Sequence, residues 1–254
     1  MARPRGAGRR GLTPIRRYYP PVRFRAIFFD AGETLVHPHP SFPELFSEVL
    51  AREGHPVSMD AIHEQVHHIG ERFSQAARDR ELWTTSPDRS RAFWLSVYER
   101  FLAGLGVPGG DGLHEILYRE FTDLANYALF DDVAPALASL RGSGVTLGIV
   151  SNFEEWLERL LERLGVADEF DVRVISGLEG IEKPDPRIYR LALERAGVEP
   201  ERSAFVGDSP EFDVDPPAAL GMFPVLIDRR ERHPSFGGVR IRRLTELAGV
   251  LEAA

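Results

Sequence analysis

The chain has 254 residues, 43% of them hydrophobic, and a formal net charge of −8. This length suits one large domain or two modest ones. The chain contains no cysteine, which excludes disulfides, thiolate metal sites and a cysteine nucleophile. It has neither an apolar run long enough to span a bilayer nor the apolar segment of a secretory signal, so we expect a cytoplasmic protein without a membrane partner.

Positive charge is concentrated at the N-terminus. Residues 1–24 hold seven arginines and no acidic residue, and removing their charge from the total leaves residues 25–254 at −15. An acidic body of this kind argues against a nucleic-acid-binding domain. Because the basic segment has little apolar content with which to fold, we predict a disordered tail over residues 1–24. A contact between this tail and RNA or an acidic protein is the alternative.

The first predicted strand lies at residues 24–29, a short apolar and aromatic run. From about residue 40 to 127, apolar residues recur at helical spacing without a strand pattern. After residue 131, strands alternate with helices. The later predicted strands span residues 145–150, 172–175, 203–206 and 224–227, and the predicted helices span residues 154–164, 186–196 and 216–220.

This order of elements predicts an α/β fold. Alternating strands and helices form a Rossmann-like parallel sheet with helices on both faces. The helical block interrupts the sheet after its first strand and is expected to form an all-helical cap domain. We assign residues 25–38 and 128–254 to the core and residues 39–127 to the cap.

Polar residues follow each of the first four core strands. Ligands of open parallel sheets bind beyond the carboxyl ends of the strands, so these residues should meet along one rim. The clusters are Asp30, Ser151-Asn152, Lys183, and Gly207-Asp208-Ser209 with Asp213.

Lys183 is the single lysine of a chain that carries thirty arginines. Lysine is a compact point charge, whereas arginine is a broad planar fork. A position that keeps lysine against so strong a bias is expected to need a compact ammonium beside a small anionic centre.

The residue types in these clusters suit phosphoryl transfer. Asp30, Asp208 and Asp213 could bind Mg²⁺, which favours a few carboxylates together with water and phosphate oxygens. Lys183 would offset negative charge, so that an anionic substrate can approach an anionic nucleophile. The Ser151 hydroxyl and the backbone N–H groups after it can hold phosphate oxygens. An aspartate can attack phosphorus to form an aspartyl-phosphate.

Four motifs of this chain resemble those of the haloacid dehalogenase-like (HAD) hydrolase superfamily: Asp30-Ala31-Gly32-Glu33-Thr34-Leu35, Ser151-Asn152, Lys183-Pro184-Asp185 and Gly207-Asp208-Ser209-x-x-x-Asp213. The resemblance covers nearly everything after residue 24. It is to the subclass with a helical cap inserted after the first motif. It implies that Asp30 is the nucleophile and a metal ligand, and that Thr34 steadies the loop around it.

The same resemblance implies roles for the other motifs. Ser151, Asn152 and Lys183 are expected to bind the phosphoryl group, and Lys183 also to orient the nucleophile. Asp208 and Asp213 would hold Mg²⁺ directly or through water.

One position departs from the family pattern. Family phosphatases usually carry a second aspartate two residues after the nucleophile, which protonates the leaving group and then activates water. Here that position is Gly32. General acid–base help is worth ~10²–10⁴-fold, so hydrolysis of alkyl phosphates is expected to be weakened by about that much. Glu33 and His37 are candidates for a replacement acid.

We therefore predict a Mg²⁺-dependent phosphatase of a small phosphorylated metabolite, monomeric or weakly dimeric, that acts through an aspartyl-phosphate. One alternative is a 2-haloacid dehalogenase-type hydrolase. Those relatives also lack the second aspartate, although a metal-binding Gly-Asp-Ser cluster is not expected in them. The other alternative is a catalytically impaired protein that binds a phosphorylated ligand or acts as a scaffold.

The cap is expected to select the substrate because it closes over the rim. Its candidate residues are His37, His39, Trp83, Arg91 and Trp94. Of these, Trp94 is expected to belong to the cap core, and Arg91 to make a solvated contact. His63, His67 and His68 have helical spacing that could bind a metal, but no carboxylate cluster completes such a site, and we interpret them as a surface face.

Overall fold

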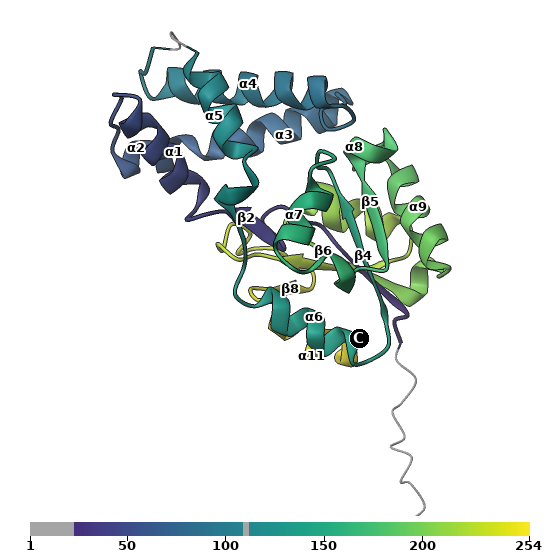
Figure 1. The fold of residues 1–254 in the computed structure, drawn as a ribbon. Coiled ribbons are helices and arrows are strands. Elements are labelled where there is room, and N and C mark those ends of the chain that lie inside the picture. The colour runs from purple at the N-terminus through teal and green to yellow at the C-terminus, as the bar shows by residue number, and fades with distance from the viewer. Residues whose placement is uncertain (1–22, 109–111) are drawn as a thin grey trace, which may run out of the picture.

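The computed structural model describes residues 23–108 and 112–254 (Figure 1). The predicted tail at residues 1–24 lies outside these ranges except for Arg23 and Phe24. Phe24 is 1% exposed, and its ring centroid lies 5.2 Å from that of Phe223. The last residue of the predicted tail therefore belongs to the folded core.

The core is a six-stranded sheet in which every neighbouring pair of strands is parallel (Figure 1). The strand order is β5-β4-β1-β6-β7-β8. The strands are β1 (Ala26–Phe29), β4 (Thr146–Ser151), β5 (Val172–Ile175), β6 (Ser203–Gly207), β7 (Phe223–Ile227) and β8 (Arg240–Ile241). Because β1 lies between β4 and β6, the residue that follows it lies in the middle of the row of strand ends and not at an edge of the sheet.

Helices cover both faces of this sheet. They are α6 (Val133–Arg141), α7 (Leu157–Arg163), α8 (Ser176–Glu179), α9 (Pro186–Ala196), α10 (Asp215–Ala219) and α11 (Leu247–Ala253). Successive side chains of a strand point to opposite faces. Accordingly, Ile27 and Phe29 pack in a cluster with α6, α7 and α11, whereas Ala26 and Phe28 pack in a second cluster with α9.

The cap consists of five helices of the described residues that lie between two short strands. They are α1 (Phe42–Arg52), α2 (Met59–Gln65), α3 (His67–Asp79), α4 (Pro87–Gly104) and α5 (Leu113–Phe121). The strands β2 (Val36–Pro38) and β3 (Tyr127–Leu129) pair antiparallel and connect the cap to the core (Figure 1). The predicted α/β fold with an inserted helical domain is confirmed.

Helix boundaries follow from local chemistry. The Asp185 carboxylate accepts a 2.9 Å hydrogen bond from the backbone N–H of Arg187 at the start of α9. Gly197 ends that helix with a φ of 62°, a left-handed conformation that glycine adopts readily. The elements that were not predicted are β2, β3, β8, α6, α8 and α11. All but α6 are too short or too weakly periodic to predict, whereas α6 has Val133, Ala136, Leu137 and Leu140 at helical spacing. Short 3₁₀ turns span Leu124–Asn126, Ala167–Glu169, Pro200–Arg202 and Leu244–Glu246.

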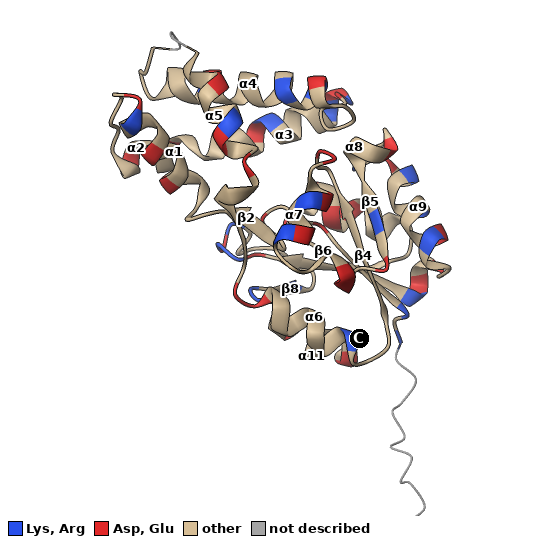
Figure 2. Ribbon diagram, viewed as in Figure 1, with Lys and Arg blue, Asp and Glu red and all other residues tan. Residues whose placement is uncertain are grey.

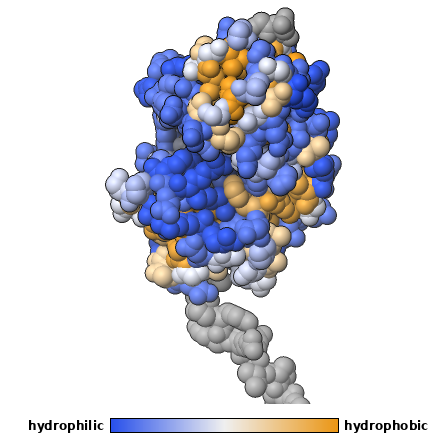
Figure 3. Space-filling model, turned by 90° about the vertical axis from the view of Figure 1, so that its left-hand side faces the viewer, coloured by the Kyte–Doolittle hydropathy of each residue, from blue (hydrophilic) through white to orange (hydrophobic). Residues whose placement is uncertain are grey.

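Figure 2 shows Lys, Arg, Asp and Glu positions on the helices of cap and core and on several loops, with both signs interspersed. On the face drawn in Figure 3, hydrophilic residues dominate and hydrophobic residues gather in separate patches. Among the helices that the structure describes, none has the length and apolar character needed to cross a bilayer.

Candidate active site

Asp30 directly follows β1 and is 7% exposed. Its backbone N–H donates a 2.9 Å hydrogen bond to the carbonyl of Val206 in β6. From the other side, the last residue of β4, Ser151, donates from Oγ to Oδ1 of Asp30 at 3.0 Å. The parallel register of the three strands therefore brings the two predicted residues Asp30 and Ser151 together.

Lys183 lies in the loop between α8 and α9 and is 3% exposed. Its Nζ donates to Oδ1 of Asp30 and to Oδ1 of Asp213, both at 2.7 Å. Burial alone lowers the pKa of the Lys183 ammonium, but the charges of Asp213 and Asp30 outweigh it and raise that pKa above its ordinary value. A compact, charged ammonium thus bridges two carboxylates.

Asn152 holds the loop that carries Lys183. Its Nδ2 donates to the Lys183 carbonyl at 2.8 Å, and its Oδ1 accepts from the Lys183 backbone N–H at 2.6 Å. Both side-chain amide atoms are therefore occupied by the backbone of the loop. This placement gives Asn152 a positioning role beside the substrate-binding role expected from the motif.

Asp208 and Asp213 complete a cluster of carboxylates at the end of β6. One oxygen from each, together with one from Asp30, lies within 4.8 Å of the others. Burial, reinforced by the charges of Asp30 and Asp213, raises the pKa of Asp208 to about 7. Burial also raises the pKa of Asp213 to about 6, although Lys183 acts in the opposite direction. Three carboxylates this close together favour the binding of a cation.

The chemistry of the donor set fits Mg²⁺, which binds oxygen ligands and usually only a few carboxylates. Asp213 lies in a π-helical turn (Pro210–Val214), and its Oδ2 accepts from the backbone N–H of Ser209 at 3.0 Å. A Cβ atom on Gly207 would lie 2.3 Å from Cγ of Asp213. Glycine at position 207 therefore leaves the space that the Asp213 carboxylate occupies.

Gly32 and Glu33 form the turn after Asp30. A Cβ atom on Gly32 would meet nothing closer than Cε2 of Phe153 at 4.0 Å, so the site has room for a side chain that the chain does not supply. Glu33 has a left-handed φ of 55°, and its carboxylate pairs with Arg230 at 2.9 Å. The ion pair directs Glu33 toward Arg230.

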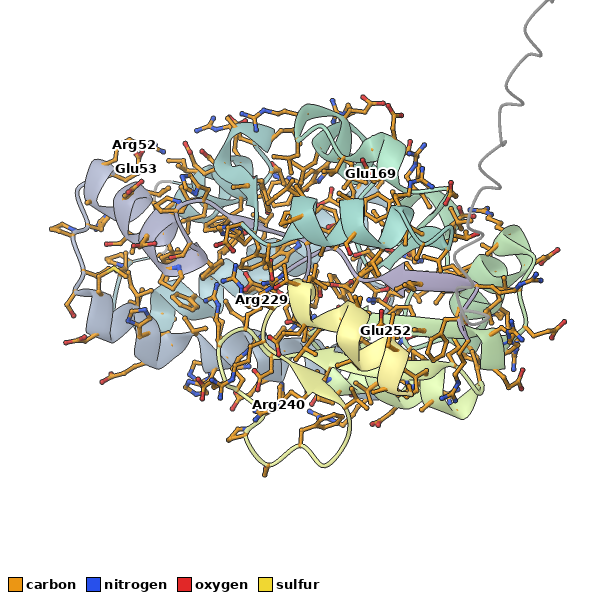
Figure 4. The ribbon with its side chains drawn as sticks, turned by 90° about the horizontal axis from the view of Figure 1, so that it is seen from below. Arg52, Glu53, Glu169, Arg229, Arg240 and Glu252 are labelled. Carbon is orange, nitrogen blue, oxygen red and sulfur yellow. The ribbon has the colours of Figure 1, made fainter. Side chains whose placement is uncertain are left out.

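Thr34 is completely buried, and its Oγ1 has no hydrogen-bond partner among the described residues. Its backbone carbonyl accepts a 2.8 Å hydrogen bond from Nη2 of Arg229, whose Nη1 donates to Asp132 at 3.0 Å. Figure 4 shows Arg229 near the middle of the molecule, whereas Arg52 lies at the far end of the cap. An inward-facing arginine thus supports the loop that follows Asp30.

A cavity of about 670 Å³ lies above these residues, between core and cap. Its polar floor includes Asp30, Ser151, Lys183, Asp208 and Asp213. Much of its wall is aromatic. The aromatic residues come from the cap, from the core and from the hinge, which is the β2–β3 pair that connects the two. Six of these wall residues are Phe73, Trp83, Trp94, Tyr118, Phe153 and Trp156.

The cap candidates separate into two groups. Trp83 and Trp94 line the cavity, whereas His37, His39 and Arg91 are not among its lining residues. His37 lies in β2, where its Nδ1 is 2.7 Å from the carbonyl of Pro38. Arg91 pairs with Glu115 on the outside of the cap. The placement of His37 does not favour the role of surrogate acid.

The prediction that no carboxylate accompanies the histidines of α3 is wrong. One ligand atom from each of His67, His68 and Glu71 lies within 4.8 Å of the others. Glu71 falls on the same helix face because residues three and four positions apart are neighbours. His63 is not part of this cluster, which is largely exposed to solvent.

Sequence reasoning missed the residues that join the cap to the core. The buried Glu182 carboxylate accepts hydrogen bonds from the backbone N–H of Trp83 at 3.1 Å, the backbone N–H of Thr84 at 2.8 Å and the Thr84 hydroxyl at 2.6 Å. Glu154 accepts a 2.7 Å hydrogen bond from the hydroxyl of Ser90. Both acids lie next to recognised motifs, but nothing in the sequence indicates their cap partners.

Sequence reasoning also missed the basic loop after β7. Nη2 of Arg232 donates to Oδ2 of Asp208 at 2.7 Å, and both Arg230 and Arg232 line the cavity. The rule that ligands bind at the carboxyl ends of parallel strands could have identified this loop, because it follows the fifth strand of the core.

Residues 24–221 match the family of haloacid dehalogenase-like hydrolases. The chain belongs to this family. Among curated proteins, this hydrolase is 36% identical over 141 residues to haloacid dehalogenase-like hydrolase domain-containing protein 3 of Mus musculus, a match that covers 54% of the present chain and 56% of the relative. The chain thus spans about half the length of that relative.

Two further proteins are similar over more of their length. The hydrolase is 33% identical over 186 residues to a phosphoserine phosphatase of Thermus thermophilus, covering 72% of each chain. A crystal structure of a HAD phosphatase from Thermococcus onnurineus superposes with a TM-score of 0.57 at 27% identity, over 90% of this chain and 98% of that one.

Proposed function

We propose that this hydrolase is a Mg²⁺-dependent phosphatase in which Asp30 attacks phosphorus. The observation that carries the proposal is the position of the Lys183 ammonium, 2.7 Å from one oxygen of Asp30 and 2.7 Å from one oxygen of Asp213. This contact orients the Asp30 carboxylate at the floor of the cavity. The names of the Thermus thermophilus and Thermococcus onnurineus proteins support a phosphate ester as the substrate.

The reaction has two steps. An oxygen of the Asp30 carboxylate forms a bond to phosphorus, and the bond from phosphorus to the leaving oxygen breaks, with its electron pair going to the leaving group. Water then attacks phosphorus, the bond to Asp30 breaks, and the protons of that water remain on the released phosphate. In this proposal Ser151 Oγ and the Lys183 ammonium bind oxygens of the phosphoryl group.

Asp30, Asp208 and Asp213 would hold the Mg²⁺ ion, which supplies compensation for the negative charge of the phosphoryl group when bound. Neighbouring residues hold the Asp213 carboxylate in position for this role. Gly207 makes room for Asp213, and the backbone N–H of Ser209 fixes that carboxylate from the side away from Lys183.

With Gly32, this phosphatase lacks the acid/base aspartate that family phosphatases usually have two residues after the nucleophile. The acid that follows Gly32 in sequence, Glu33, is paired with Arg230. We therefore infer that the leaving group departs without a proton from position 32, and that hydrolysis of alkyl phosphates is slow.

Hydrolysis of p-nitrophenyl phosphate tests the proposal, because nitrophenolate leaves without a proton. The wild type is expected to release phosphate with Mg²⁺ and to stop with EDTA, and Asp30→Asn is expected to be inactive in both. Equal rates for wild type and Asp30→Asn would overturn the proposal. Chloride release from 2-chloropropionate without phosphate release would favour the dehalogenase alternative instead.

A further inference from the structure

The cap contributes a connected set of aromatic rings to the cavity. Trp83 lies 4.9 Å from Phe73 between ring centroids, and Phe73 lies 5.7 Å from Trp94. Trp94 in turn stacks on Tyr98 at 5.7 Å. All four residues line the cavity. Such rings bind flat apolar groups, and an additional ring prefers offset or edge-to-face contact at similar distances.

The core and the hinge supply a second aromatic set on the side of the nucleophile. Phe153 and Trp156 meet edge to face at 4.7 Å, and Trp156 meets Tyr127 in the same manner at 5.4 Å. Phe153 is the side chain nearest to the vacant space beside Gly32, at 4.0 Å from the position of a Cβ atom. Where a family phosphatase usually has its acid, this cavity has an aromatic edge.

The two features select for the same kind of leaving group. An alkoxide is a poor leaving group without a proton, whereas a phenolate is far more stable and can depart as the anion. The lost acid therefore discriminates most strongly against alkyl phosphates. The aromatic walls independently favour a flat ring over a polar aliphatic chain.

We propose that the substrate is a phosphate monoester of a phenol-type hydroxyl, whose ring binds between Phe153 and the cap aromatics. This inference rests on the proposed phosphatase function and names its substrate class. The aryloxide leaves with the electron pair of the P–O bond and takes its proton from water after release. Phe153 is then a specificity-determining residue that contacts the leaving group.

Three phosphorylated compounds separate ring binding from leaving-group quality. They are 1-naphthyl phosphate, which has a ring and a good leaving group, acetyl phosphate, which has a good leaving group and no ring, and benzyl phosphate, which has a ring and a poor leaving group. We expect turnover of the first two, with a KM for naphthyl phosphate at least tenfold below that for acetyl phosphate. Benzyl phosphate is expected to inhibit competitively while turning over slowly.

Phe153→Leu keeps the apolar volume and removes the ring. It is expected to raise KM for naphthyl phosphate and the inhibition constant of benzyl phosphate by up to about tenfold, the factor that one aromatic contact contributes. The kinetics of acetyl phosphate should not change. Phe236→Leu is the matched control, because Phe236 is not a cavity residue, and it should leave all three substrates unaffected.

The outcomes distinguish the two proposals. If acetyl phosphate is hydrolysed but naphthyl phosphate has an equal or higher KM, the phosphatase function stands and the aryl substrate class is wrong. If Phe153→Leu raises KM equally for naphthyl phosphate and acetyl phosphate, Phe153 acts on the site as a whole and not on a ring. If neither naphthyl phosphate nor acetyl phosphate is hydrolysed, the phosphatase function itself fails.

Discussion

The only lysine of the chain, Lys183, donates a 2.7 Å hydrogen bond to the nucleophile candidate Asp30 in an environment that leaves 3% of Lys183 exposed. An arginine in its place would have to fit a broad guanidinium where an ammonium already touches two carboxylates. The compositional exception in the sequence therefore corresponds to a steric and electrostatic requirement in the site.

Lys183→Arg is expected to lower kcat on p-nitrophenyl phosphate by at least ~10²-fold, because a misplaced nucleophile alone can cost that much. Lys183→Met should in addition lower the free energy of unfolding by about 3 kcal/mol without Mg²⁺, since it leaves buried carboxylates unpaired. Activity assays and urea unfolding measure the two effects. Wild-type activity in Lys183→Arg would show that the site accepts any cation.

Gly32→Asp is expected to raise turnover of an alkyl substrate such as phosphoserine by about 10²-fold or more, the usual contribution of a general acid. The side chain has room, because the nearest atom to a Cβ is Phe153 Cε2 at 4.0 Å. Gly32→Asn has the same shape without an acidic proton and serves as the control. Equal rates for the two variants would mean that proton transfer at this position does not limit the reaction.

Gly207→Ala is expected to displace the Asp213 carboxylate, because the added Cβ would lie 2.3 Å from its Cγ. The stabilisation of the protein by Mg²⁺, measured as a shift in Tm, should therefore shrink or disappear. Gly249→Ala, where a Cβ meets nothing within 4 Å, is the control and should keep the full shift. An unchanged shift in Gly207→Ala would remove Asp213 from the metal site.

Mg²⁺ binding should weaken as pH falls. The pKa values of Asp208, about 7, and Asp213, about 6, are raised, so both carboxylates take up protons as the solution is acidified from neutral pH. In the metal-free protein the folded state then holds protons that the unfolded chain has released, so its stability falls as pH rises from about 4 to 7. Mg²⁺ opposes this loss.

The shift in Tm produced by Mg²⁺ should accordingly be larger at pH 7.5 than at pH 5.5. Differential scanning calorimetry with Mg²⁺ or EDTA at both pH values measures it. Asp208→Asn should reduce the pH dependence, because one of the two titrating carboxylates is gone. A shift of the same size at both pH values would contradict the assignment of these residues as ligands.

Glu182→Ala is expected to loosen the cap where the α3–α4 loop contacts the core. The backbone N–H groups of Trp83 and Thr84 lose their acceptor, so their hydrogen exchange should accelerate in the variant. Arg187→Ala, on the outside of α9, is a control for substitution nearby. If Trp83 and Thr84 exchange at the wild-type rate in Glu182→Ala, the acid does not hold the cap.

The sequence predicted the parts of the fold that depend on periodic apolar residues. Strands 172–175 and 203–206 coincide with β5 and β6 to within one residue, because buried parallel strands are continuous apolar runs. The hinge strands β2 and β3 are three residues long and could not be read from periodicity. They are fixed by pairing with each other and not by their own composition.

The candidate site was predictable only in part for a similar reason. Asp30 follows β1 and Ser151 ends β4, its neighbour in the sheet, so sheet geometry brings them together. The contact from Glu182 to Thr84 joins core and cap across 98 positions of sequence, and no local pattern encodes it. The aromatic wall was not predicted either. Trp94 was interpreted as a residue of the cap core, and it meets Phe153 only in the folded cavity between cap and core.

Trapping the covalent intermediate tests the central claim most directly. Because Gly32 also removes the residue that would activate water in the second step, the aspartyl-phosphate should accumulate during turnover of an aryl phosphate. Mass spectrometry of the acid-quenched and digested enzyme is expected to find one phosphoryl group on the peptide that contains Asp30, and none in Asp30→Asn. Phosphate release with an unmodified Asp30 peptide at every time point, or with full activity in Asp30→Asn, would contradict the account.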